Sequence, residues 1–166
     1  MAVSTVVKHF TDVSVSLEDG TGTAVTLTVP RVMVGLSISG IKQGQQAVHA
    51  YQTRGTLHSL RLGELEFATV SFQCMQADLT DASTGEIKDF ILKTNAYSGN
   101  LSTRSGGANA EVYTVKMVIT IEGTDHGDSA DHTVSLDDVH FTLDITDGAP
   151  NVDSFSGTVY GAISFT

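Results

Sequence analysis

The densest group of residues that could do chemistry is the segment 125–132, which reads Asp-His-Gly-Asp-Ser-Ala-Asp-His. Carboxylates and imidazoles are the side chains that bind divalent metals, so the segment is a candidate metal site. Its spacing matches neither a zinc motif nor an EF-hand calcium loop, and Asp, Gly and Ser are also typical of turns between strands. The pattern therefore favours a solvated turn over a metal ion, and the sequence predicts no cofactor.

No other group of residues points to catalysis. Oxygen ligands for calcium could come from four residues, but these fit a solvated loop better: Asp144, Asp147, Asn151 and Asp153. Glu64 and Glu66 are two residues apart on a predicted strand, as paired catalytic carboxylates might be. A glycosidase is disfavoured because the chain has no tryptophan, and a serine hydrolase is disfavoured because no Gly-x-Ser-x-Gly motif occurs. We expect a protein that is not an enzyme.

The composition is that of a single globular domain, residues 1–166, with 40% hydrophobic and 17% charged residues. The lone cysteine, Cys74, lies within an apolar strand pattern, so we expect a buried thiol rather than a disulfide. Neither a signal-peptide core nor a run of about 20 apolar residues occurs, which predicts a protein without a membrane span that is kept in a cytoplasm.

Charge is distributed unevenly along a chain whose formal net charge is −10. The segment 20–63 contains basic residues and no acid, whereas the chain after Lys116 contains acids and neither Lys nor Arg. Scattered cations do not make a tight nucleic-acid site, but oppositely charged regions can steer one subunit onto another. The basic residues are therefore candidates for a subunit or ring interface: Arg31, Lys42, Arg54 and Arg61.

Alternation of apolar and polar residues dominates the chain and predicts half-buried strands. A Gln-rich segment, 40–55, is too long for a tight turn and predicts a long loop or arm. Capping-box spacing before residues at i, i+3 and i+4 predicts one helix at about 84–94. A parity switch near Ala68 predicts a bulge in a strand 64–75. The fold class is mainly β, an antiparallel β-sandwich or barrel with one flanking α-helix.

The strand faces predict which side chains fill the core. One face of each main strand is apolar, and that face should be buried. The expected core residues are Val13, Val15, Val115, Met117, Ile119, Phe141, Leu143 and Ile145.

The segments 131–141, Asp-His-Thr-Val-Ser-Leu-Asp-Asp-Val-His-Phe, and 156–161, Ser-Gly-Thr-Val-Tyr-Gly, together with the order of the predicted elements, resemble the phage tail tube proteins and the related secretion-system tube proteins. The resemblance spans nearly the whole chain as a pattern rather than as a single motif. It implies a structural virion protein that forms hexameric rings, which stack into the tube through which DNA leaves the virion.

The same resemblance implies the partners and the location. The partners would be copies of the chain itself, other tail proteins such as the tape measure, terminator and tip, and DNA that passes without sticking. The protein would lie in the tail of the virion, after assembly in the host cytoplasm. A secretion-system tube protein and a carbohydrate-binding or adhesive β-sandwich are the alternatives.

Acidic residues could line the channel of such a tube. Two adjacent predicted strands, 131–137 and 138–144, have polar, acidic faces opposite their core faces. Acids on the wall would prevent a polyanion from adhering. The candidate lumen-facing residues are Asp131, Asp137, Asp138, His140 and Asp144.

Overall fold

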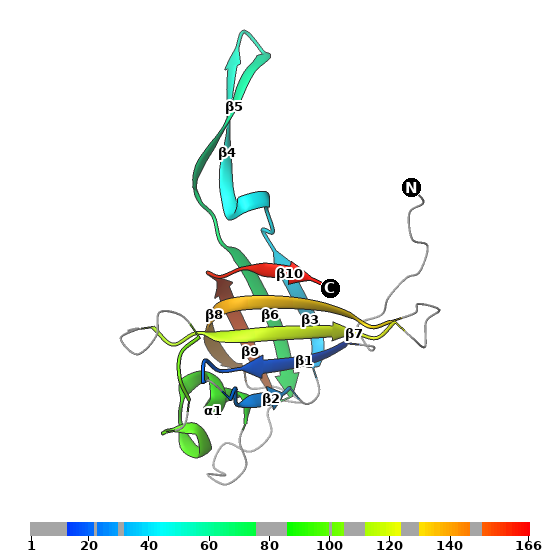
Figure 1. Ribbon diagram of the computed structural model, residues 1–166, viewed down its shortest axis with the longest axis vertical. Helices are drawn as coiled ribbons and strands as arrows, with labels where there is room; N and C mark the ends of the chain where they lie inside the picture. Colours follow the sequence, from blue (N-terminus) through cyan, green and yellow to red (C-terminus); the bar gives the residue numbers. More distant parts are fainter. Residues whose placement is uncertain are drawn as a thin grey trace.

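The computed structural model describes residues 13–21, 23–29, 32–75, 86–99, 101–104, 112–123, 130–146 and 151–166. These residues form antiparallel strands and one short α-helix, which confirms the predicted fold class (Figure 1). The elements in chain order are β1 (Val13–Glu18), β2 (Thr26–Thr28), β3 (Val32–Ser39), β4 (Gln46–Thr53), β5 (Thr56–Leu65), β6 (Ala68–Met75), α1 (Ile87–Leu92), β7 (Val115–Ile121), β8 (His132–Thr146), β9 (Val152–Val159) and β10 (Ile163–Phe165).

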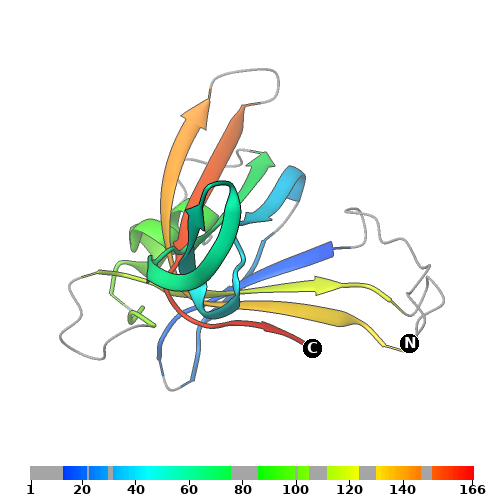
Figure 2. The same ribbon diagram turned by 90° about the horizontal axis from the view of Figure 1, so that it is seen from above.

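The main sheet has eight strands in the order β2-β1-β7-β8-β9-β6-β3, with β10 also paired to β8. It folds over on itself, so that β1, β7, β10 and the first part of β8 cross the strands β9, β6 and β3 steeply (Figure 2). Such a crossing is typical of orthogonal sheet packing, in which one strand bends round the corner. The two halves of the sheet enclose the core between them.

The corner is made by β8, which carries a bulge at Asp137 and Asp138. Met117 of β7 pairs with Leu136, but Val115, two residues away, pairs with Val139, so β8 contains an extra residue there. Asp138 adopts a left-handed backbone with φ of 53°, which Asp tolerates better than most residues. The prediction of two strands at 131–137 and 138–144 is therefore wrong, because a bulge changes the parity of the apolar face without ending the strand.

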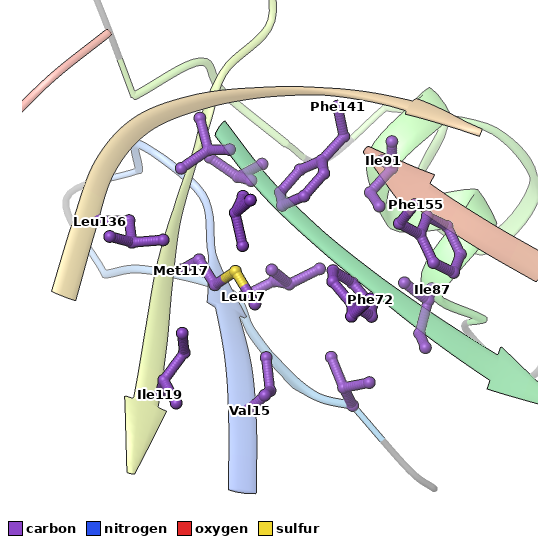
Figure 3. Packing of buried hydrophobic residues seen from close by; sticks show 14 of the residues in the cluster. Val15, Leu17, Phe72, Ile87, Ile91, Met117, Ile119, Leu136, Phe141 and Phe155 are labelled. Atoms are coloured by element: carbon purple, nitrogen blue, oxygen red, sulfur yellow. The ribbon is translucent and has the colours of Figure 1, made fainter. Parts of the chain in front are cut away.

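Most of the residues predicted to be buried do lie in the hydrophobic core (Figure 3). The side chains of Val15, Val115, Met117, Ile119 and Phe141 are buried. Around them the ring of Phe72 stacks on Phe155 with centroids 5.0 Å apart and meets Phe141 edge-on at 5.8 Å.

The predicted core is wrong at the end of β8. Burial declines along one face from Phe141, which is buried, through Leu143, which is partly buried, to Ile145, which is 57% exposed. The face is the expected one, but the strand extends beyond the core. Val13, near the start of β1, is likewise only partly buried.

Gly157 of β9 makes room for one of these core rings. A Cβ at this position would lie 2.7 Å from Cε1 of Phe141 and 2.7 Å from Cγ1 of Val139. Gly157 is directly opposite Phe141 in the β8–β9 ladder, so the aromatic ring covers the glycine backbone. Only a glycine fits at this position without displacing the ring.

Two other predicted elements differ from the structure. The strand predicted at 64–75 is two strands in different sheets, since β5 ends at Leu65 and β6 begins at Ala68. The helix predicted at 84–94 is present but shorter, from Ile87 to Leu92, and it ends where Lys93 adopts a left-handed φ of 54°. Part of the predicted capping box, residues 83–85, lies outside the described residues. Within the described part of the chain no helix is long and apolar enough to cross a membrane.

Candidate assembly interface

The strands β4 and β5 form a separate two-stranded hairpin that projects from the body along the long axis of the molecule (Figure 1). We call this hairpin, residues 46–65, the arm. At its tip Arg54 and Gly55 both have positive φ, 50° and 80°, as a tight two-residue hairpin turn requires. The predicted loop or arm at 40–55 is therefore the first half of a longer hairpin.

Bulges in β5 shift its register with β4, so that the leucines of the arm share one face. Val48 pairs with Leu62 and Ala50 pairs with Leu60, and paired residues share a face in an antiparallel ladder. The register shifts on either side of these pairs, so that Leu57 pairs with Gln52 and Leu65 pairs with Gln46. The resulting leucine face consists of Val48, Ala50, Leu57, Leu60, Leu62 and Leu65.

The leucine face is uncovered. Its large side chains are 53% to 67% exposed, although they belong to residue types that are usually buried. Burying one such side chain fully is worth about 1.5–3 kcal/mol, and an isolated two-stranded hairpin is marginally stable at best. An exposed apolar patch of this kind is typical of a protein–protein interface.

The opposite face of the arm is polar and basic. His49 pairs with Arg61, and Tyr51 pairs with Ser59. Arg54 is exposed at the tip, and Lys42, just before the arm, forms an ion pair with Glu66. Three of the four predicted interface residues, Lys42, Arg54 and Arg61, thus lie on the arm or at its base, whereas Arg31 lies outside the described residues.

An open groove of about 680 Å³ lies at the base of the arm, next to β10. We call it the base groove. Its apolar lining includes an edge-on pair, Phe67 and Tyr160, with ring centroids 4.8 Å apart, and Phe165, which is 64% exposed. The polar side chains that line it are engaged, since the Gln45 amide donates to the Gly161 carbonyl at 3.0 Å and Lys42 pairs with Glu66. Its apolar lining residues are Ile41, Leu65, Phe67, Tyr160, Ala162, Ile163 and Phe165.

The predicted lumen residues lie along β8 and fall into two groups. Three of them have structural roles near the start and the corner of the strand. Asp131 accepts a hydrogen bond from the Gly123 amide at 3.0 Å, Asp137 lies 3.4 Å from Arg104, and Asp138 is the bulge residue with positive φ. These carboxylates do more than present charge to solvent.

The other two predicted lumen residues, His140 and Asp144, are exposed on the second half of β8. The Nδ1 atom of His140 lies 3.0 Å from the carbonyl oxygen of Tyr113. Because β8 bends at Asp138, this pair lies on a different half of the sheet from Asp131. The five predicted residues therefore do not form one cluster.

The candidate metal segment 125–132 lies mostly outside the described residues. Among the residues that the structure describes, no group of three His, Cys, Asp or Glu side chains could hold a metal ion. Cys74 is buried, as predicted, and burial, with a smaller contribution from Asp153, raises the pKa of its thiol to about 12. The thiol is therefore protonated and unreactive at neutral pH.

Sequence reasoning placed the arm but missed its leucine face. The leucines are spaced three, two and three residues apart, which departs from strict alternation. Two bulges in one strand give this spacing on a single face, so the signal was present in the sequence.

Chains in several solved structures share this fold. One, in the sheath/tube terminator of an extracellular contractile injection system, PVC, in its extended state, aligns with a TM-score of 0.57 and 16% identity over 99% of both chains. Another, in the PVC sheath-tube complex, aligns with a TM-score of 0.56 and 13% identity over 99% of both chains. A third, in the cap of the anti-feeding prophage (its tube terminating cap), has a TM-score of 0.56 and 12% identity over 100% of this chain and 94% of that chain.

The comparisons with sequences found no relative. No protein-family model matches the chain, and no curated protein matches it significantly. The similarity to the solved structures extends over the whole chain, including the arm, and at these identities it is a similarity of fold.

Proposed function

We propose that this chain is a structural subunit that assembles with copies of itself into stacked rings, forming the tube of a phage tail or of a tail-like injection system. The observation that carries the proposal is the leucine face of the arm. A hairpin with large apolar side chains exposed along one face is explained most simply by a partner that covers it.

The comparisons support this proposal at the level of fold. The similar chains come from structures described as a sheath/tube terminator, a sheath-tube complex and a tube terminating cap. The alignment covers essentially all of this chain, so the proposal concerns the entire subunit. No catalytic step is part of it.

Strand edges offer a second set of contacts for a ring. In the described part of the chain, β2, β3 and β10 each pair with a strand on one side only. Unpaired edges accept strands from other chains. In our proposal the edges pair only after the arm contact has brought neighbouring subunits together. The result is a hexameric ring with a continuous inner sheet, whose channel face includes the exposed residues His140 and Asp144.

A terminator that closes the end of a tube is the second candidate function, and the descriptions of two of the similar structures favour it. A main tube protein adds rings without limit, whereas a terminator forms one ring and stops. The two functions therefore differ in whether the purified chain alone grows beyond a single ring.

Sedimentation velocity over a range of concentrations tests the proposal. We expect the wild-type chain to form particles larger than a monomer. The variant Leu60→Ser with Leu62→Ser should remain a folded monomer. The matched control Leu92→Ser removes an exposed leucine on α1 and should assemble like the wild type. A wild-type chain that stays monomeric at every concentration would overturn the proposal.

A further inference from the structure

Two uncovered apolar surfaces occur on the same chain, the leucine face of the arm and the base groove. We propose that the leucine face of one copy docks into the base groove of a second copy. This inference rests on the proposed self-assembly and names the surface that receives the arm.

The lining of the base groove suits a dry contact with aliphatic side chains. Its exposed lining is aromatic and aliphatic, from Phe165 on β10, Tyr160 before β10, and Phe67 after the arm. The polar groups of Gln45 and Lys42 already have partners within the chain. The groove therefore offers few free donors or acceptors to orient a polar small molecule, whereas leucine side chains require none.

Charge complementarity favours a second copy as the occupant. The arm brings Arg61 on its polar face and Arg54 at its tip. The turn that lines the groove is hydrogen-bonded to an acidic corner, since the amides of Tyr160 and Gly161 donate to the carbonyls of Asp138 and Asp137. The Asp137 carboxylate there already lies 3.4 Å from Arg104, so the acidic charge left for a partner comes from the rest of the chain after Lys116, which contains acids and neither Lys nor Arg. A hairpin that carries these arginines meets charge of the opposite sign on the acidic half of a second copy, which favours a second copy as the partner.

The position of the groove excludes contact with the outer arm of the same copy. The arm is a continuous hairpin that rises away from the body, while the groove lies at its base with Leu65 as part of its wall (Figures 1 and 2). Leu57, Leu60 and Leu62 lie farther out along the hairpin than Leu65, and none of them is part of the groove wall. They can reach a groove only on another copy.

A contact between two different patches has a consequence for assembly. Each copy then presents one donor surface, the leucine face, and one acceptor surface, the base groove. Contacts of this head-to-tail kind build closed rings or open stacks rather than symmetric dimers. A closed ring, which the proposed function requires, is one of the two outcomes of this geometry.

A mixing experiment with two folded variants tests the inference. The arm variant, Leu60→Ser with Leu62→Ser, keeps an intact groove. The groove variant, Ile41→Ser with Phe165→Ser, keeps an intact arm, and both of its substituted side chains are exposed. By light scattering after gel filtration, each variant alone should be a monomer. Mixed in equal amounts, the two should form a one-to-one dimer and nothing larger, because each partner blocks one end.

Other outcomes separate this inference from the proposed function. A groove variant that assembles like the wild type, while the arm variant does not, would overturn the groove as receiver and leave self-assembly intact. Two folded monomers that fail to pair when mixed would also overturn it, because the mixture contains an intact arm on one variant and an intact groove on the other. A wild type that never assembles would instead overturn the proposed function.

Cross-linking provides a second measurement in case a serine variant misfolds. Chains carrying Leu60→Cys and chains carrying Phe165→Cys are mixed and treated with a short bis-maleimide. The native Cys74 is buried and serves as the unreactive background. We expect a cross-linked dimer only in the mixture. A dimer formed as readily by Leu60→Cys alone would contradict the docking of arm in groove.

Discussion

Val48 and Leu62 lie directly opposite each other on the arm, and their side chains are 60% and 67% exposed. Cross-strand apolar pairs stabilise a sheet through contact between the paired side chains, and the exposed side of such a pair is normally covered by the core. Here nothing in the described part of the chain covers the pair. The fold therefore presents an apolar surface whose stabilisation depends on a contact with another molecule.

The core assignment predicts different costs for residues of similar type. Ile119→Ala and Phe141→Ala should each lower the free energy of unfolding by about 2–5 kcal/mol, because both side chains are buried. Ile145→Ala is the matched control, and it should stay within about 0.5 kcal/mol because that side chain is exposed. Urea denaturation measures all three. Equal costs for Ile119 and Ile145 would contradict the packing described here.

Asp19 predicts a dependence of stability on pH. Its buried carboxylate accepts hydrogen bonds from the Ser102 amide, the Thr21 hydroxyl and the Val25 amide. Burial alone would raise the pKa of Asp19, but these hydrogen bonds outweigh burial and lower the pKa below its usual value of 3.8. The carboxylate therefore stabilises the fold above about pH 4, and this contribution is lost as the pH falls through the lowered pKa.

Asp19→Asn should remove that dependence. Near neutral pH the variant should be less stable by about 1–3 kcal/mol, and the difference from the wild type should shrink at about pH 3. Urea denaturation at the two pH values is the measurement, with the exposed Asp144→Asn as control. A difference that stays constant between them would mean that the hydrogen bonds do not favour the charged form.

The basic residues of the arm should control association. Arg54→Glu with Arg61→Glu reverses the charge of exposed side chains, so the subunit should fold but assemble poorly, most clearly at low salt, where charges are least screened. Arg54→Lys with Arg61→Lys keeps the charge and should assemble nearly normally. Sedimentation at two salt concentrations measures the effect. Normal assembly of the Glu variant at low salt would show that the charge asymmetry is incidental.

The next prediction concerns Asp144 and the release of DNA. It applies if the chain lines a tube that conducts DNA. Asp137 and Asp138 have structural roles at the corner of β8, so the exposed Asp144 gives the cleaner test. Asp144→Lys should allow assembly but slow the release of DNA, because one attractive charge is repeated in every subunit. Screening limits the effect to about 8 Å at 0.15 M salt.

Ejection kinetics in vitro at two salt concentrations measure this effect, with Asp144→Asn as the neutral control. If particles confirmed to contain the Lys variant release DNA at the wild-type rate at low salt, Asp144 lies away from the channel. Its charge would then contribute only to solubility.

The sequence predicted the strand faces well where one face is buried. In β1 and β7 the alternation identified Val15, Met117 and Ile119 correctly, because a side-chain period of two leaves little freedom in register. It failed at the corner of β8. A bulge and the end of a strand both change the parity of the apolar face, so the sequence alone could not distinguish one bent strand from two.

The candidate interface was harder to predict. The leucine spacing in β5 indicates an apolar face only once two bulges are known, and it does not say whether that face is covered by the same chain or by another. The distinction depends on the arm lying away from the core, which only the three-dimensional arrangement shows (Figure 1). The basic residues Arg54 and Arg61 were predicted because charge asymmetry is visible in the sequence itself.

Negative-stain electron microscopy of the purified chain tests the central claim most directly. The wild type should form rings, stacked into tubes if it is a main tube protein and single if it is a terminator. The arm variant, Leu60→Ser with Leu62→Ser, should show neither, although it is folded. A folded wild-type chain that shows only monomers over a wide range of concentration, or an arm variant that forms the same rings, would contradict assembly through the leucine face.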